Sequence, residues 1–130
     1  MNAVDILFYL WELPQNLLGL LLSRIMAKGQ RGQVREFRGT RILRSDRMRG
    51  GISLGRYIIL SATGWEPDID RHEWGHSRQS RLLGPFYLPV VGIPSLFWAA
   101  WWRPGRKHGY YTFYTERWAD RLAGIRRRIT

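Results

Sequence analysis

Two histidines and a glutamate stand close together in the segment His72-Glu73-Trp74-Gly75-His76. Residues four apart in an α-helix lie one turn apart on the same face, so the two imidazoles would point the same way. A tetrahedral zinc site needs this separation, and the carboxylate beside them could take the proton of an activated water. The spacing therefore predicts metal-assisted hydrolysis, with His72 and His76 as ligands and Glu73 as the general base.

A second acidic pair follows further along the chain, on another predicted helix. Glu116 lies forty residues after His76, and Asp120 lies one helical turn after Glu116 on the same face. As a third ligand, Glu116 would leave one zinc position open for water, as a hydrolytic site requires. Asp120 could accept a hydrogen bond from the outer nitrogen of a ligand imidazole, and His72 is the expected partner.

The two motifs together resemble those of the gluzincin metallopeptidases, in which His-Glu-x-x-His is followed on a later helix by Glu-x-x-x-Asp. The wording Glu116-Arg-Trp-Ala-Asp-Arg-Leu looks especially like the membrane-bound prenyl-protein and heat-shock metalloproteases, which share a Glu-x-x-Ala-Asp-Arg element. The short chain is similar to the minimal scaffolds called minigluzincins. The resemblance covers roughly residues 52–124. The chain departs from the gluzincin pattern at Asp70 and Arg78, where such peptidases commonly keep uncharged or apolar residues.

The resemblance implies a zinc cofactor, a peptide or protein substrate, and an α+β minimal zincin-like domain. In that domain an N-terminal helix precedes a small sheet, and the zinc lies between the His-Glu helix and the Glu-Asp helix. Side chains just before the second helix could stabilise the oxyanion that forms when water attacks a carbonyl, although most of them also suit ordinary surface or core positions. These candidates are His108, Tyr110, Tyr111 and Tyr114.

The bulk composition favours one domain over residues 1–130 and narrows the chemistry. The chain has no cysteine, which excludes disulfides, thiolate nucleophiles and Cys-ligated zinc. A net charge of +11, carried mostly by arginine, favours an anionic membrane surface as a neighbour. Nucleic acid is disfavoured because no nucleic-acid-binding motif accompanies the charge. The first basic residue is Arg24, so no secretory signal is recognised, and a membrane-associated or a cytoplasmic location both stay open.

Residue patterns outside the motifs predict the elements that position them. Residues 1–32 read as a bent apolar amphipathic helix and a loop, because polar residues interrupt the apolar stretch 6–22. Interleaved apolar and basic residues after Val34 predict one or two exposed strands, and residues 52–60 predict a hairpin that could form the upper rim of a substrate cleft. Asp68 or Asp70 could cap a helix over 69–83.

The segment 82–102 contains no charged residue over twenty-one positions, which is long enough for a membrane span. Its three prolines argue against a regular helix, so we expect either a loop packed over the domain or an interfacial or re-entrant element. Residues 111–128 return to helical spacing, with Trp118, Leu122 and Ile125 on one predicted apolar side.

Two other functions compete with the peptidase hypothesis. The first is a non-enzymatic basic module that binds a membrane surface or nucleic acid, in which zinc is structural or absent. The second is a zinc-binding pseudoenzyme or latent form, whose N-terminal segment blocks the cleft. The sequence predicts neither the cleavage preference nor the oligomeric state.

Overall fold

A computed structural model of the chain describes residues 2–27, 33–48, 50–62, 68–102 and 109–126. These residues form an α+β fold with five α-helices and one four-stranded sheet, which confirms the predicted class. Along the chain the elements are α1 (Ala3–Trp11), α2 (Leu13–Ala27), β1 (Gln33–Phe37), β2 (Thr40–Ser45), β3 (Gly51–Leu54), β4 (Tyr57–Ser61), α3 (Ile69–Leu83), α4 (Ile93–Trp101) and α5 (Tyr114–Ala123). Short helical turns η1 (Gly84–Phe86) and η2 (Leu88–Gly92) connect α3 to α4, and η3 (Tyr110–Thr112) precedes α5.

The sheet has the strand order β1-β2-β4-β3, and only β2 and β4 pair in parallel. A tight turn joins β1 to β2, where Arg38 and Gly39 both have positive φ angles of 48° and 82°. Such turns match the natural twist of paired strands. Gly55, with φ of 64°, begins the turn between β3 and β4. β3 stands at one end of the strand order, so it is an edge strand with one side open.

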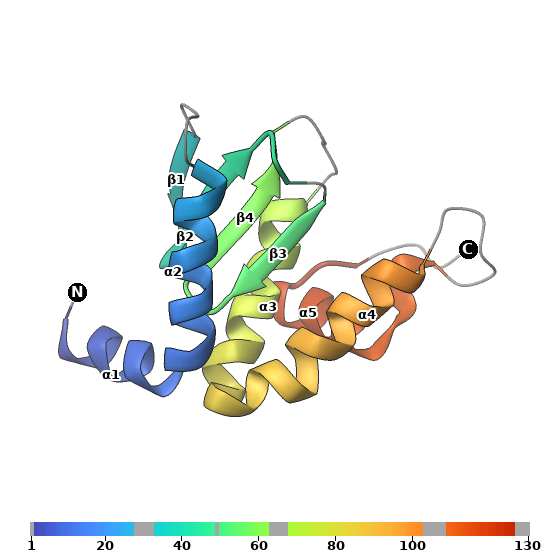
Figure 1. Cartoon of the computed structure of the whole chain (residues 1–130). Helices are drawn as coiled ribbons and strands as arrows, with labels where there is room; N and C mark the ends of the chain where they lie inside the picture. Colours follow the sequence, from blue (N-terminus) through green and yellow to red (C-terminus); the bar gives the residue numbers. More distant parts are fainter. Residues whose placement is uncertain (1, 28–32, 49, 63–67, 103–108, 127–130) are drawn as a thin grey trace.

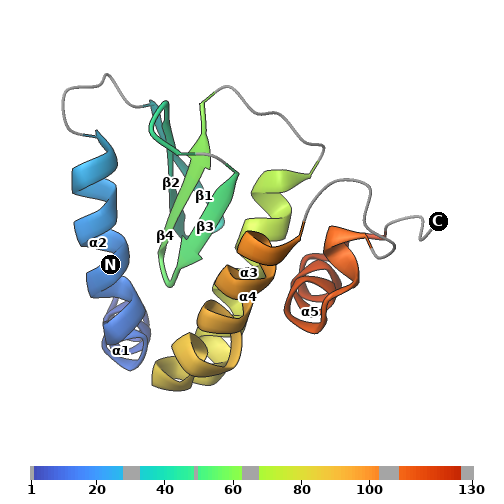
Figure 2. The ribbon, with the colours of Figure 1, turned by 45° about the vertical axis from the view of Figure 1, so that its right-hand side comes forward.

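Helices α2 and α3 lie on opposite sides of the sheet (Figures 1 and 2). The main core cluster consists of Ile42, Ile58 and Leu60, and Ile69 of α3 packs against it. Because side chains alternate along a strand, the intervening residues of β4 face the other side, where Tyr57 meets Gly19 of α2. The sheet is covered on both faces, which explains why β4 is buried along almost its whole length.

The polar residues that interrupt the N-terminal apolar stretch are structural ties. The chain bends by 90° between α1 and α2, beside the buried Glu12. Gln15 donates to Ser80 Oγ at 2.8 Å and to the Gly84 carbonyl at 2.7 Å, which joins α2 to the end of α3. The predicted bend is present, and α2 lies on the domain.

No single described helix is both long and apolar enough to cross a membrane, although the bent pair α1 and α2 meets the length and composition limits jointly.

The apolar segment 82–102 is helical almost throughout, so the prediction of an irregular packed loop is wrong. Pro85, Pro89 and Pro94 each stand at the first or second position of a new helical segment. Proline is tolerated there because the first N–H groups of a helix have no partner within it. The short 3-10 and π turns of η1 and η2 absorb the bends.

α5 differs from its prediction in length and in orientation. It ends at Ala123, because Gly124 adopts a left-handed conformation and closes the helix, whereas residues 127–130 lie outside the described part. Its buried face carries Thr115, Glu116, Ala119, Asp120 and Ala123. Trp118 and Leu122 are only partly buried, and Ile125 beyond the end of the helix is buried, so only one of the three residues on the predicted apolar side is buried.

Candidate metal centre

The candidate centre forms where α3 and α5 approach each other closely. A Cβ atom built on Gly75 would lie only 2.1 Å from the backbone oxygen of Ala119, so this position of α3 accepts no side chain. Because Gly75 has no side chain, the backbones of α3 and α5 come close enough for short side chains of the two helices to contact each other. This approach brings both halves of the sequence motif together from segments forty residues apart.

Two imidazole nitrogens converge on one carboxylate oxygen at this junction. His72 Nε2 and His76 Nε2 each lie 3.2 Å from Glu116 Oε1. All three residues are buried, with no more than 5% of their surface exposed. The other oxygen of Glu116 accepts hydrogen bonds from Thr115 Oγ1 at 2.8 Å and from Ser95 Oγ at 3.1 Å. The carboxylate is thus held with one oxygen turned toward the histidines.

The outer nitrogens of both histidines face hydrogen-bond acceptors. His72 Nδ1 lies 2.7 Å from Asp120 Oδ1, and His76 Nδ1 lies 2.7 Å from Gln79 Oε1. The amide nitrogen of Gln79 donates to the Thr115 carbonyl at 2.8 Å, which fixes the amide so that its oxygen points at the histidine. Each Nδ1 must therefore carry a proton to donate, and each Nε2 lone pair is available for a metal.

The electrostatics of the site call for positive charge between the histidines and Glu116. Burial lowers the pKa of His72, but its contacts with Asp120 and Glu116 outweigh burial and raise the pKa to about 9. The pKa of His76 is also raised: burial opposes this shift, and the charge of Glu116 outweighs it. Burial pushes the pKa of Glu116 upward, yet the two histidines hold it well below its usual range.

The donor set fits a cation. With both Nδ1 atoms donating outward, neutral histidines would direct two Nε2 lone pairs at a carboxylate oxygen, an arrangement of acceptors only. Either protons on both Nε2 atoms or a metal ion between the three groups resolves this conflict. Ligand atoms of His72, Glu73 and His76 also lie within 4.8 Å of one another. The buried His-Glu-His cluster could therefore hold a metal ion.

Glu73 is the second carboxylate beside the histidines, and its surroundings differ from those of Glu116. It is 5% exposed and lines a cavity of about 490 Å³ together with His76 and Glu116. A Cβ atom on Gly51 of the edge strand would lie 3.0 Å from Glu73 Oε1, so the strand runs directly beside the carboxylate. Glu73 thus lies between the histidines and β3, and its carboxylate could contact a water molecule in the cavity.

The cavity is largely apolar, and three walls enclose it beside the metal-centre residues of α3 and α5. α2 contributes one wall, β3 the second and η2 with α4 the third. Its apolar lining includes Leu18, Leu21, Leu22, Ile25, Ile52, Leu54, Leu88, Ile93 and Leu96. The ionisable groups are gathered at the metal-centre end of this cavity.

The four oxyanion candidates have different positions. Tyr110 lines the cavity, and burial together with the nearby Glu116 raises its pKa well above the usual value, which keeps the phenol protonated. The ring of Tyr111 packs edge-on against His72, with centroids 4.9 Å apart. Tyr114 is exposed and donates to the Val90 carbonyl at 2.7 Å, so the structure does not bring it to the site. His108 lies outside the described residues.

Three residues that help to hold the site were missed from the sequence: Gln79, Ser95 and Thr115. Gln79 could have been found from its spacing, because it follows His76 by three positions on the same helical face. Ser95 had no such signal, since its contact with α5 depends on how the apolar segment folds back.

Comparisons with protein families, curated proteins and solved structures found no match. The function must therefore be inferred from the site itself.

Proposed function

We propose that this chain is a zinc-dependent metallopeptidase of the gluzincin type, with a minimal zincin-like fold. One observation carries the proposal: His72 Nε2 and His76 Nε2 both lie 3.2 Å from Glu116 Oε1. Asp120 and Gln79, bonded to the outer nitrogens, add support because second-sphere partners of this kind orient histidine ligands. Three protein ligands leave a zinc position open, which is typical of catalytic rather than structural sites.

A zinc ion bound by His72, His76 and Glu116 would supply Lewis-acid chemistry, lowering the pKa of water and polarising the scissile carbonyl. Glu73 accepts the proton of the attacking water and passes it to the leaving amine. Asp120 and Gln79 keep the imidazoles in the tautomer that leaves Nε2 unprotonated. Tyr110 is protonated and lines the cavity beside Glu116, so of the tyrosines it is the candidate to donate to the developing oxyanion.

The cavity favours an extended peptide with large apolar side chains. β3 is an edge strand beside Glu73, so a substrate backbone could pair along it, as in other complexes formed by strand addition. The aliphatic side chains of α2 and α4 would then receive the substrate's side chains. Their leucine and isoleucine side chains reject charged groups, which are costly to desolvate.

The decisive experiment measures zinc content in the purified protein and in two variants. We expect close to one zinc per chain, loss of most of it in Glu116→Ala, and full retention in Glu73→Gln. Glu73→Gln should also abolish hydrolysis of apolar peptides, because the amide cannot accept the water's proton. Tyr114→Phe is a matched control, since Tyr114 points away from the site and should tolerate the change.

Each alternative has its own outcome. Full zinc occupancy in Glu116→Ala would refute the ligand assignment and the gluzincin proposal with it. Stoichiometric zinc with no hydrolysis by the unaltered chain would favour a pseudoenzyme or a latent form, since α2 of the N-terminal segment forms one wall of the cavity. No zinc in any of the proteins would favour the non-enzymatic basic module.

A further inference from the structure

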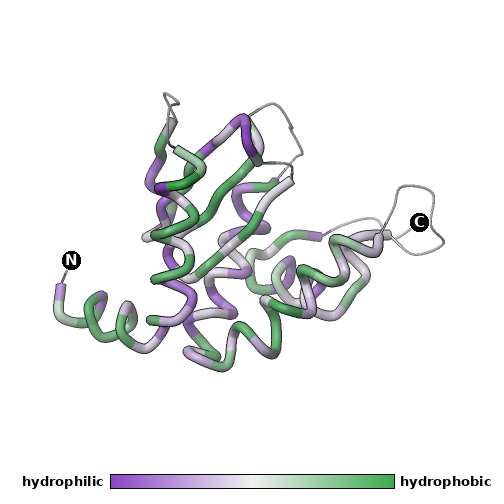
Figure 3. The backbone as a smooth tube through the Cα atoms, in the orientation of Figure 1, coloured by the Kyte–Doolittle hydropathy of each residue, from purple (hydrophilic) through white to green (hydrophobic). Residues whose placement is uncertain are grey.

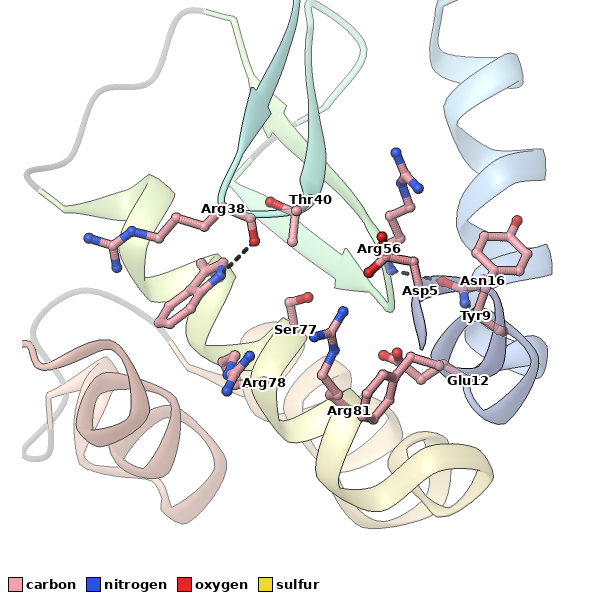
Figure 4. Close-up of a pocket in the computed structure, with 13 residues that line it drawn as sticks. Asp5, Tyr9, Glu12, Asn16, Arg38, Thr40, Arg56, Ser77, Arg78 and Arg81 are labelled. Atoms are coloured by element: carbon pink, nitrogen blue, oxygen red, sulfur yellow. Dashed lines mark hydrogen bonds between the residues drawn. The ribbon is translucent and has the colours of Figure 1, made fainter. Parts of the chain in front are cut away.

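A second cavity lies on the other side of α3, away from the candidate metal centre. It has a volume of about 270 Å³ and lies between α1, α3 and the two hairpin turns of the sheet. Four arginines line it: Arg38 and Arg56 from the hairpin turns, and Arg78 and Arg81 from α3 (Figure 4). We call it the arginine pocket. Such a concentration of guanidinium groups around one cavity is suited to an anion that several of them can contact.

Aromatic rings, rather than carboxylates, hold three of these arginines. The guanidinium carbons of Arg38 and Arg78 lie 4.9 and 5.4 Å from the centre of the Trp74 ring. Arg81 lies 4.4 Å from the centre of the Phe8 ring. Within the described part of the chain, no carboxylate lies at ion-pairing distance from these three guanidinium groups. Stacking on a ring orients a guanidinium and leaves its N–H groups available at the edge.

The carboxylates in the pocket do not cancel the arginine charge. Asp5 and Glu12 are the two acidic residues among its lining side chains, so four arginines leave an excess of two positive charges among the lining residues; outside the lining, Glu36 lies 4.0 Å from Arg56. Both carboxylates have other partners: Asp5 accepts from its own helix N-terminus, and Glu12 accepts from Ser80 Oγ at 2.6 Å. An incoming anion therefore meets a positive surface.

An apolar face adjoins the arginine pocket and shares α1 with it. Phe8, Tyr9 and Glu12 of α1 line the pocket, whereas Leu7 and Leu10 of the same helix are 66% and 57% exposed. Exposed apolar side chains are also present after the end of α3 and on α4, elements that lie with α1 along the lower side of the molecule in Figures 1 and 3. There Phe86 is 63% exposed and Phe97 is 72% exposed. Exposed apolar side chains gathered in this way mark an interaction surface.

We propose that this face docks onto an anionic lipid bilayer, with α1 and α4 lying in the interface and the arginine pocket binding a lipid phosphate. Charge selects this occupant over a second copy of the chain. The chain carries a net charge of +11, so two copies would repel each other, whereas anionic headgroups attract both the whole chain and the pocket. Amphipathic helices with flanking arginines bind bilayers in this manner.

The metal centre and the arginine pocket lie on different sides of α3, so their side chains can be changed separately, whereas α4 belongs both to the docking face and to the wall of the metal-centre cavity. The pair Arg78→Gln with Arg81→Gln removes two charges from the pocket without touching any metal-site residue. A matched control is Arg121→Gln with Arg126→Gln, which removes the same charge from exposed positions. The control residues lie at and just beyond the end of α5, where Arg71 near the start of α3 donates to the Ala123 carbonyl at 3.0 Å. The two ends of α3 are about 22 Å apart, so the control residues, near its start, lie far from the pocket arginines near its end.

The experiment measures binding of the full chain to phosphatidylcholine vesicles with and without phosphatidylglycerol. We expect binding to the anionic vesicles, a roughly 25-fold loss in the pocket variant at about five-fold per arginine, and at least ten-fold less loss in the control. Leu7→Glu should also abolish binding, because the apolar side chains must insert. Zinc content and circular dichroism establish that each variant is folded.

Several results would overturn the proposal. Equal losses in the two arginine pairs would mean that net charge acts without the pocket. Binding of inorganic phosphate by the chain in solution, without binding to the anionic vesicles, would identify a free-phosphate site in place of a lipid site. Absence of vesicle binding, together with a dimer that Leu7→Glu dissociates, would identify the apolar face as a contact between copies.

Discussion

Gly75→Ala places two physical effects in opposition at the centre of the site. In an exposed helix, replacing glycine by alanine stabilises the protein by roughly 1 kcal/mol, because alanine loses less backbone entropy on folding. Gly75 is buried in α3, and its added methyl carbon would lie 2.1 Å from the Ala119 oxygen and 2.7 Å from the Ala119 carbonyl carbon. These are backbone atoms of α5, which cannot rotate away as the end of a side chain can.

The displacement that the methyl group requires can be worked out from these distances. An ordinary contact begins at 3.4 Å, so α5 would have to move by about 1.3 Å relative to α3. Overpacking of this kind costs about 1 to 3 kcal/mol. The upper end of this cost exceeds the roughly 1 kcal/mol that the gain in helix propensity contributes. Glu116 lies one turn before Ala119 on the same helix and moves with it. Metal ligands tolerate shifts of only about 0.2 Å, so zinc affinity should fall by roughly 100-fold or more.

The assay combines zinc competition against a chromophoric chelator with thermal melting in the presence and absence of zinc. Gly109→Ala is the control, because nothing crowds a Cβ atom there: its nearest neighbour would be a Thr112 methyl group at 3.8 Å. That variant should keep the zinc affinity and melting temperature of the unaltered chain. If Gly75→Ala instead binds zinc as tightly and melts at a higher temperature, helix propensity dominates and the close approach of α3 and α5 does not determine the site.

Two further substitutions test residues around the metal centre, and a third tests the buried Glu12 beside the arginine pocket. Asp120→Asn should weaken zinc binding by roughly 10- to 100-fold, measured by chelator competition, and an unchanged affinity would remove Asp120 from the site. Gln79→Leu should have an effect of similar size, because His76 loses the acceptor that fixes its tautomer; an unchanged affinity would show that the amide is dispensable. Burial raises the pKa of Glu12, so its stabilising contribution is full below its ordinary pKa and is lost as the pH rises through the folded value. Glu12→Gln should therefore raise the melting temperature more at about pH 7 than at about pH 4, and the opposite order would contradict this assignment.

The His-Glu helix could be predicted closely, because its signals are local. The structure gives the same bounds, Ile69–Leu83, for this helix, and Gly84 with φ of 56° ends it as expected. The sequence offered Asp68 or Asp70 as the cap at the start of this helix. Asp68 occupies the N-cap position, but its side chain makes no capping hydrogen bond. Asp70 instead contacts Arg35 and Arg44 at 2.8 and 2.9 Å, which ties the start of the helix to the sheet. The departure from the gluzincin pattern at this position therefore has a structural role.

The orientation of α5 could not be predicted from apolar spacing, because small and polar residues form its buried face. Ala119 permits close approach to Gly75, and Glu116 and Asp120 are satisfied by the histidines of α3. Burying such carboxylates is favourable only with partners that a one-dimensional pattern does not reveal. The motif interpretation placed Glu116 and Asp120 together on one face, and the hydropathy interpretation placed the large apolar residues inside. The structure follows the motif.

The two proposed sites can share α3 because the His-Glu-x-x-His spacing constrains only one face of the helix. His72, Glu73, His76 and Gln79 share the face toward α5 and the cavity. Four other residues of α3, Trp74, Ser77, Arg78 and Arg81, line the arginine pocket. At 3.6 residues per turn, the four residues of the metal-centre face fall on one side of the helix and the four pocket residues on the other. The charge at Arg78, unexpected in a gluzincin motif, can therefore serve the second face without approaching the metal ligands. An anion bound in the pocket would therefore lie on the opposite side of α3 from the proposed metal ligands, and no residue of α3 lines both cavities.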